Sequence, residues 1–132
     1  MGERTTAWIL PKGGEAASSN IRIEEITLPD IGPDQCLVES VYGCWEGNMS
    51  HAIDRNPVDV AKQRGEDYVV LGNAGVVRIL AVGDNVTTVK NGEFAVLFCN
   101  GVWDKWGFPI KIFGYDAPGS IGLLAKRTVL HQ

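Results

Sequence analysis

The sequence predicts a mainly β fold of short strands, on two observations. Apolar and polar residues alternate with a period of two along most of the chain, which is the pattern of half-buried strands. The 132 residues also include 16 glycines but only 8% aromatic residues, which favours frequent tight turns over long helices. A chain of this length typically forms one domain. We therefore expect a single domain over residues 1–132.

Turn residues divide the expected strands. Residues 5–10 (TTAWIL) form the first strand, and Pro11 ends it. Residues 20–28 (NIRIEEITL) form the second, whose apolar phase slips between Ile23 and Ile26 as at a bulge. Further strands are expected at residues 36–42, at 68–82 with an interruption at Gly72 and Asn73, and at 93–99, 110–113 and 123–130.

Helix signals are confined to the middle of the chain. Asn56 and Pro57 resemble an N-cap and a first helical residue, and they predict a short helix that ends at Arg64. Residues 46–52 are expected to form another short helical turn. About seven short strands with one or two short helices predict a small, partly open β-barrel or a sandwich.

Composition excludes several classes of partner. The formal net charge is −4, and Lys and Arg do not cluster, which argues against nucleic acid and against anionic membrane surfaces. No stretch approaches the roughly 18 apolar residues of a membrane span, and the first residues do not form a secretory signal. The three cysteines form no CxxC pair. We expect reduced thiols and a cytoplasmic location.

Several segments resemble the GroES-like domain of medium-chain dehydrogenases/reductases, in the same order along the chain. They are residues 28–32 (LPDIG) followed by Leu37 and Val38, residues 82–93 (VGDNVTTVKNGE), and residues 122–125 (GLLA). Residues 99–104 (CNGVWD) and 112–116 (IFGYD) look closer to the crotonyl-CoA carboxylase/reductase branch of this family. The quinone oxidoreductase branch is the other branch that the sequence resembles. The resemblance implies a GroES-like, partly open β-barrel.

The zinc ligands of the zinc-dependent members are missing from the matching positions. Trp45 stands where those members have a cysteine ligand, and Asn73 stands in the segment that provides a histidine. An indole does not bind zinc, and His51 and His131 have no partner at ligand spacing. No metal site is expected.

The resemblance also suggests that no dinucleotide is bound. The family binds NAD(P)H on a Rossmann domain that begins just after a segment like residues 129–132, where this sequence stops. No GxGxxG motif occurs, and residues 72–75 (GNAG) lack the first glycine and a following helix. The Met1 start favours a complete chain over an excised domain, so we expect no cofactor.

Candidate site residues lie in segments that line the cleft of the family. Aromatic and Met side chains with a few uncharged donors suit an apolar substrate. The expected substrate contacts are Trp45, Met49, Tyr68, Asn100, Trp103 and Trp106, and the expected catalytic residues are the donors Asn48, Asn73 and Tyr115 with His51 as an acid or base.

Each candidate also has a structural interpretation. The tryptophans and Met49 equally suit packing, the asparagines suit turns, and His51 suits a surface position. Glu46 is expected to be a solvated loop charge.

Three functions remain open from the sequence. The first is a cofactor-independent cyclase that folds an apolar polyene polyketide macrolactone for a [4+2] or [6+4] cycloaddition, as the resemblance to stand-alone GroES-like cyclases of bacterial polyketide pathways implies. Such catalysis needs shape and oriented donors rather than a nucleophile. The alternatives are the N-terminal substrate-binding domain of an NADPH-dependent reductase and a non-catalytic ligand-binding module. Unpaired strand edges would favour a homo-oligomer.

Overall fold

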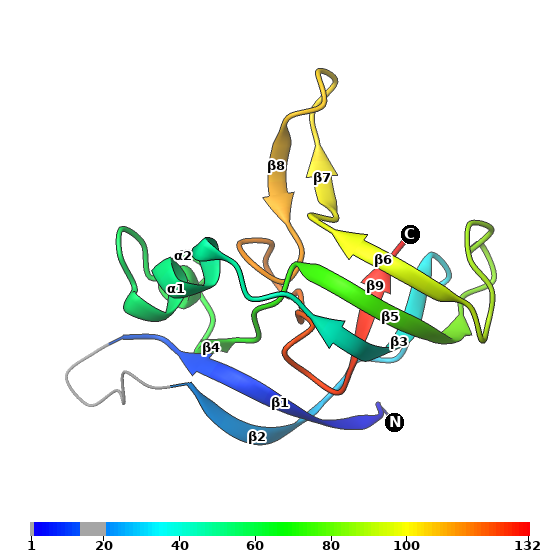
Figure 1. Ribbon diagram of the computed structural model, residues 1–132, viewed down its shortest axis with the longest axis horizontal. Helices are drawn as coiled ribbons and strands as arrows, with labels where there is room; N and C mark the ends of the chain where they lie inside the picture. Colours follow the sequence, from blue (N-terminus) through cyan, green and yellow to red (C-terminus); the bar gives the residue numbers. More distant parts are fainter. Residues whose placement is uncertain (1, 14–20) are drawn as a thin grey trace.

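Three antiparallel sheets and two short helices make up the part of the chain that the computed structural model describes, residues 2–13 and 21–132 (Figure 1). One sheet has the order β2-β1-β4, with β1 at Arg4–Pro11, β2 at Arg22–Thr27 and β4 at Tyr68–Val69. The largest has the order β6-β5-β3-β9, with β3 at Gln35–Gly43, β5 at Ala74–Val82, β6 at Phe94–Phe98 and β9 at Arg127–His131. The predicted mainly β fold is confirmed, and the described strands do not close into a barrel.

The third sheet is a hairpin that projects from the body of the molecule as an arm (Figure 1). It consists of β7 (Gly101–Trp103) and β8 (Pro109–Ile112). The helices α1 (Gly47–Asp54) and α2 (Val60–Arg64) lie together at one end of the body, near β1 and β4 (Figure 1).

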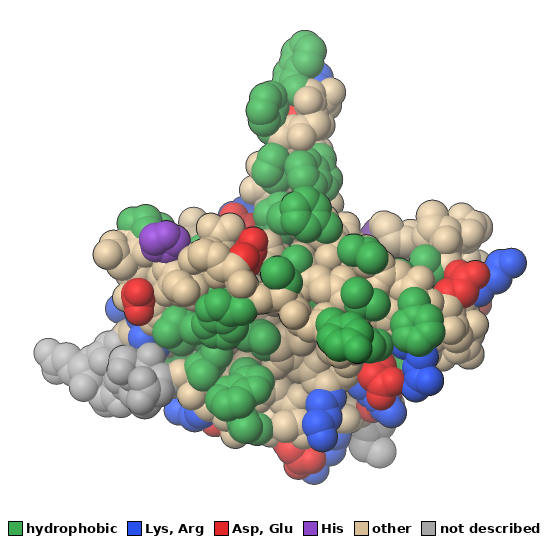
Figure 2. Space-filling view, in the orientation of Figure 1, with side chains coloured by type: hydrophobic (Ala, Val, Ile, Leu, Met, Phe, Trp, Pro, Cys, Tyr) green, Lys and Arg blue, Asp and Glu red, His purple; other side chains and the backbone are tan. Residues whose placement is uncertain are grey.

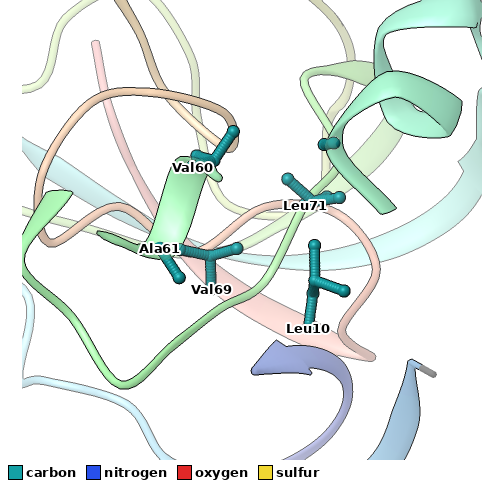
Figure 3. Packing of buried hydrophobic residues seen from close by; sticks show 6 residues of the cluster. Leu10, Val60, Ala61, Val69 and Leu71 are labelled. Carbon is teal, nitrogen blue, oxygen red and sulfur yellow. The ribbon is translucent and has the colours of Figure 1, made fainter. Parts of the chain in front are cut away.

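Two buried clusters follow from the alternation of the strands. The inner face of the four-stranded sheet buries Cys36, Val38, Val77, Ile79, Leu97 and Leu123. The other cluster joins the helices to β1 and β4 through Leu10, Ala52, Val60, Ala61, Val69 and Leu71, five of which are labelled in Figure 3. A third, smaller cluster lies between β1, β2 and residue Ala125. Apolar burial of this kind is the main term that stabilises the fold.

Residues 121–126 join the two larger sheets. The Gly122 amide donates to the Val70 carbonyl at 2.9 Å, and the Trp8 amide donates to the Leu124 carbonyl at 2.7 Å. A Cβ atom on Gly122 would lie 2.3 Å from the Leu71 carbonyl carbon, so only glycine permits this approach. The close contact fixes residues 70–73, which lead into the candidate site.

The structure corrects two local predictions. The expected bulge between Ile23 and Ile26 is wrong, because β1 and β2 pair without a register shift. Ile23 is exposed opposite Trp8, so the apparent phase slip marks an outward-facing isoleucine. The predicted N-cap at Asn56 is also wrong: Asp59 caps α2, and its carboxylate accepts from the Lys62 amide at 3.1 Å.

The short helical turn expected at residues 46–52 is present as α1. The predicted turn after Pro11 extends to Gly14, which lies outside the described residues. Neither helix in the described part of the chain has the length and hydropathy of a membrane-spanning helix.

Candidate functional site

A hollow of about 400 Å³ lies where the end of β6, the start of β5, the arm and α1 meet. Four of the predicted site residues line it, namely Asn48, Asn73, Trp103 and Tyr115. The other lining residues are mostly apolar: Phe98, Cys99, Pro109, Ile110, Ile112 and Asp116. The hollow therefore combines aromatic and aliphatic walls with a few polar groups, as ligand sites do.

Asn73 is a buried polar residue in the wall of this hollow. It is only 3% exposed, and its amide nitrogen contacts the Cys99 thiol at 3.7 Å. Its Oδ1 atom is buried and accepts no hydrogen bond from any residue that the structure describes. A buried amide oxygen without a partner costs about 1–3 kcal/mol. An unpartnered buried group of this kind calls for a structural or functional explanation.

The backbone holds Asn73 in place from two sides. Gly72 adopts φ = +118°, and a Cβ atom there would lie 2.6 Å from the Leu123 amide nitrogen. The Leu123 amide donates to the Gly72 carbonyl, and the Cys99 amide donates to the Asn73 carbonyl, both at 2.9 Å. Cys99 itself adopts a left-handed φ of +48°, which is uncommon for a residue with a side chain.

Tyr115 lies on the loop that follows β8. The nearly buried Arg64 side chain donates to the Tyr115 carbonyl at 3.1 Å and to the Ser120 carbonyl at 2.8 Å, and it pairs with Glu66. These contacts anchor the backbone of the loop, while the Tyr115 side chain packs against the cluster that contains Leu71. The position of the phenol is therefore set by the fold.

The surroundings of Tyr115 shift the titration of its hydroxyl further above neutral pH. Burial, followed by the negative charges of Asp116 and Glu46, raises the pKa of Tyr115 above its usual value. Glu46 is not the fully solvated loop charge that its position predicts, because its Oε1 atom is buried without a hydrogen-bond partner among the described residues. At neutral pH, Tyr115 is available as a neutral hydrogen-bond donor.

The remaining predicted site residues lie elsewhere. Met49 faces the core from α1 at 1% exposed, whereas Trp45 and His51 are exposed and do not line the hollow. Tyr68 lines a separate hollow beside Arg64 and Glu66. Two more predicted residues are accounted for by other contacts: the Asn100 side chain donates to the His131 carbonyl at 2.9 Å, and Trp106 lies near the tip of the arm, with Lys105 4.8 Å from its ring.

Sequence reasoning missed most of the apolar wall. Phe98 belongs to the apolar run at residues 94–98 and faces away from the buried Leu97, but a run that is apolar on both faces does not indicate which side chains line a hollow. Pro109 and Ile110 reach the wall through the hairpin, whose turn (residues 104–107, DKWG) carries the Asp and Gly of a tight turn. No sequence signal indicates that this hairpin meets Asn73.

The described residues do not fit a dinucleotide or a metal ion. A dinucleotide cradle needs a parallel strand, a glycine-rich turn and a helix in succession. The named strands of this structure pair antiparallel, and the helices have eight and five residues. Within residues 2–13 and 21–132, no three His, Cys, Asp or Glu side chains are grouped closely enough to hold a metal ion.

Solved structures with the same architecture are reductases and dehydrogenases. The crotonyl-CoA carboxylase/reductase AntE in complex with NADP matches 97% of this chain with a TM-score of 0.80 and 23% identity. The fold is that of a GroES-like domain. The 2-octenoyl-CoA carboxylase reductase CinF from Streptomyces sp. matches 99% of the chain (TM-score 0.78, 18% identity), and the quinone oxidoreductase from Coxiella burnetii matches 98% (TM-score 0.70, 14% identity).

This GroES-like chain spans about a third of each of those proteins: 35% of AntE, 37% of CinF and 35% of the quinone oxidoreductase. No protein-family model and no curated protein matches the sequence. The structural matches support the GroES-like fold of medium-chain dehydrogenases/reductases and give no support to the predicted cyclase. At these sequence identities the matches establish the fold alone, and the function has to be argued from the residues of the candidate site.

Proposed function

We propose that this chain is a substrate-binding domain of the reductase type, which holds an apolar carbonyl compound in the hollow between α1, β6 and the arm. The observation that carries the proposal is the Asn73 side chain, buried in an apolar wall with an unsatisfied amide oxygen. The volume of about 400 Å³ lies within the range of small-molecule sites.

Tyr115 supplies the donor that a carbonyl group requires. A tyrosine phenol is neutral through the physiological range, and the raised pKa of Tyr115 extends that range upward, so the O–H group donates to a ligand oxygen without losing its proton. Phe98, Trp103 and Ile110 offer apolar surface to the carbon chain of the ligand. One polar anchor and an apolar wall together orient an elongated, largely apolar molecule.

Asn73 supplies the second polar contact. With its amide nitrogen on the Cys99 thiol, the Oδ1 atom has no partner among the described residues but almost no accessible surface, so it would accept from a ligand N–H or O–H group after a local shift of the wall. If the amide rotates by 180°, the thiol donates to Oδ1 and the amide nitrogen becomes the free donor. In either arrangement the Cys99 thiol is the partner of one polar atom of the Asn73 amide, and the other polar atom is left for the ligand.

Enoyl thioesters combine these features and are the substrates that the names of AntE and CinF state. Such a molecule has an apolar chain, a conjugated carbonyl oxygen and, in its pantetheine arm, amide N–H groups. We therefore propose medium-chain enoyl thioesters as the ligand class. Reduction would require a dinucleotide held outside the described residues, so the role proposed for this chain is binding and orientation.

A binding titration tests this proposal. The probe is 2-octenoyl-pantetheine, followed by tryptophan fluorescence and by calorimetry. We expect saturable binding that Tyr115→Phe weakens about 3- to 10-fold, the effect of one hydrogen bond. Tyr68→Phe, which changes a partly exposed tyrosine that lines a separate hollow, is the matched control and should have no effect. Absence of saturable binding, or equal effects of the two variants, would contradict the proposal.

The cyclase remains a second candidate because of one feature of the hollow. A hydrogen bond from Tyr115 to a conjugated carbonyl would activate a dienophile, and the apolar walls would restrict the rotations of a polyene. Incubation with a polyene macrolactone should then give an isomer of unchanged mass, formed more slowly by Tyr115→Phe. A product heavier by two hydrogens, formed only with NADPH, would favour the reductase.

The three cysteines are free thiols in the structure. Their lack of pairing leads us to propose a reducing, cytoplasmic setting for this binding function.

A further inference from the structure

The outer face of the four-stranded sheet is apolar although nothing in the described chain covers it. Tyr42, Val76 and Val96 stand side by side on β3, β5 and β6, because their Cα atoms are register partners. Phe94 and Phe98 flank Val96 on the same face of β6, and all three of these β6 side chains are at least 66% exposed. Monomeric soluble proteins rarely expose so continuous an apolar patch.

The arm carries a second set of exposed apolar side chains. Trp103, Trp106, Phe108 and Ile110 are all large, and each is about half exposed or more. The Asp104 carboxylate accepts from the Trp106 and Phe108 amides at 2.8 and 2.9 Å, which keeps the turn formed. A two-stranded hairpin with few contacts to other strands is only marginally stable in water, so a surface that covers these side chains would stabilise the arm.

Polar groups border the sheet face on the side away from the arm. Arg78 and Glu39, which are register partners on β5 and β3, form an ion pair at 2.8 Å beside Phe94. Figure 2 shows the hydrophobic side chains over β3, β5 and β6 and along the arm, with charged side chains at the edge of the body. An apolar centre inside a charged rim is the anatomy of a protein–protein interface.

We propose that two copies of this chain form a symmetric dimer in which the arm of each lies across the outer sheet face of the other. Six aromatic side chains on these two surfaces, Tyr42, Phe94, Phe98, Trp103, Trp106 and Phe108, are 47–76% exposed. At about 200 Å² for each fully accessible aromatic side chain, they offer about 800 Å². A stable interface buries about that area on each partner.

One chain thus carries both an apolar projection and an apolar face, and an exchange of arms covers both at once. A two-fold axis makes the two contacts identical and closes the assembly at two copies.

The dimer also completes the candidate site. Phe98, Trp103 and Ile110 belong to the apolar surface and to the wall of the hollow. A second copy seated on that surface covers the mouth of the hollow and excludes water from the polar groups within it. The inference concerns assembly and goes beyond the proposed binding function, so either can fail without the other.

Sedimentation velocity on the 132-residue protein tests the dimer. We expect a dimer at micromolar concentration. Trp106→Ser combined with Phe108→Ser on the arm, or Val96→Lys on the sheet face, should raise the dimer Kd at least about 30-fold, as for interface hot spots. Ile23→Lys is the matched control, because Ile23 is an exposed apolar strand residue outside both surfaces. Circular dichroism confirms that each variant is folded.

Mixing the two variants tests the arrangement of the dimer. The arm variant keeps an intact face and the Val96→Lys variant keeps an intact arm, so a mixed dimer retains one of the two contacts. We expect the mixture to associate more strongly than either variant alone. A monomeric wild type, with or without binding to phosphatidylcholine vesicles, would overturn the proposal, and so would open-ended polymers or a mixture no stronger than its parts.

Discussion

The two faces of the four-stranded sheet are both apolar, yet residues 2–13 and 21–132 bury only one of them. The inner face places Val38, Val77 and Leu97 in the core, and all three are less than a tenth exposed. The outer face presents Val96 and Phe98 from the same β6 strand to solvent. Folding accounts for the inner face and gives no reason for the outer one. The outer face is therefore the surface on which we place the proposed contact between two copies.

Neighbouring residues on β6 give the strongest test of this comparison. Leu97→Ala removes a buried side chain and should lower the free energy of unfolding by about 2–5 kcal/mol. Val96→Ala, one residue away but 78% exposed, should change the stability of the isolated chain by less than about 0.5 kcal/mol. Urea unfolding at a concentration below the dimer Kd measures both. Similar losses would mean that the outer face is also part of the folding core.

The comparison also explains what the sequence predicts well. Apolar segments identify β1, β3, β5 and β6, because each has at least one buried face. The run FAVLF in β6 is apolar on both faces, so its pattern indicates a strand and leaves open what covers each side. The hairpin escaped prediction in part because β7 has only three residues and lacks a buried face.

The candidate site is less predictable because its parts are distant in the chain. Asn73 is noticed at the break between two apolar segments, and Tyr115 through the resemblance of its segment. Their meeting with Ile110 depends on the arm and on the loop that Arg64 anchors. The burial of Met49 depends on which side of α1 faces the core, and two helical turns give too little pattern to fix it.

Two asparagines that line different hollows should respond to the same substitution with opposite signs. Asn73→Leu removes a buried amide oxygen without a partner among the described residues and should raise the free energy of unfolding by about 1 kcal/mol. Asn100→Leu removes the donor to the His131 carbonyl and should lower it by about 1 kcal/mol. Thermal and urea unfolding measure both changes.

Gained stability at Asn73 should be accompanied by weaker binding of the enoyl probe, because the polar contact is lost. A loss of stability in Asn73→Leu would show that the amide supports the fold rather than a ligand.

The stability of the protein at alkaline pH should report on Tyr115, the titratable phenol of the hollow. The folded pKa of Tyr115 lies above its usual value, so between the two values the unfolded chain has released this proton and the folded chain retains it. The free energy of unfolding therefore falls as the pH rises from about 10 towards the folded pKa.

The difference between the wild type and Tyr115→Phe, measured by urea unfolding from pH 8 to 11, isolates this residue from the other alkaline titrations, such as that of Lys12, whose pKa the Asp67 carboxylate raises. Parallel stability curves for the two proteins would show that the Tyr115 phenol titrates normally.

The reactivity of the three thiols should differ between the inner sheet face, the hollow and the exposed surface, and this is the smallest effect that we predict. Cys36 lies on the inner sheet face, where burial raises its pKa, so little reactive thiolate forms. Cys44 is exposed at the end of β3, and Cys99 is half-buried in the hollow beside Asn73. Labelling with iodoacetamide at pH 8, followed by peptide mass spectrometry, should modify Cys44 first, Cys99 more slowly and Cys36 only after unfolding.

Because Cys99 lines the hollow, a saturating enoyl probe should slow its labelling several-fold while Cys44 stays unaffected. Equal protection of Cys44 and Cys99 would instead place the ligand on the outer sheet surface, and fast labelling of Cys36 would mean that the inner face opens in the native state.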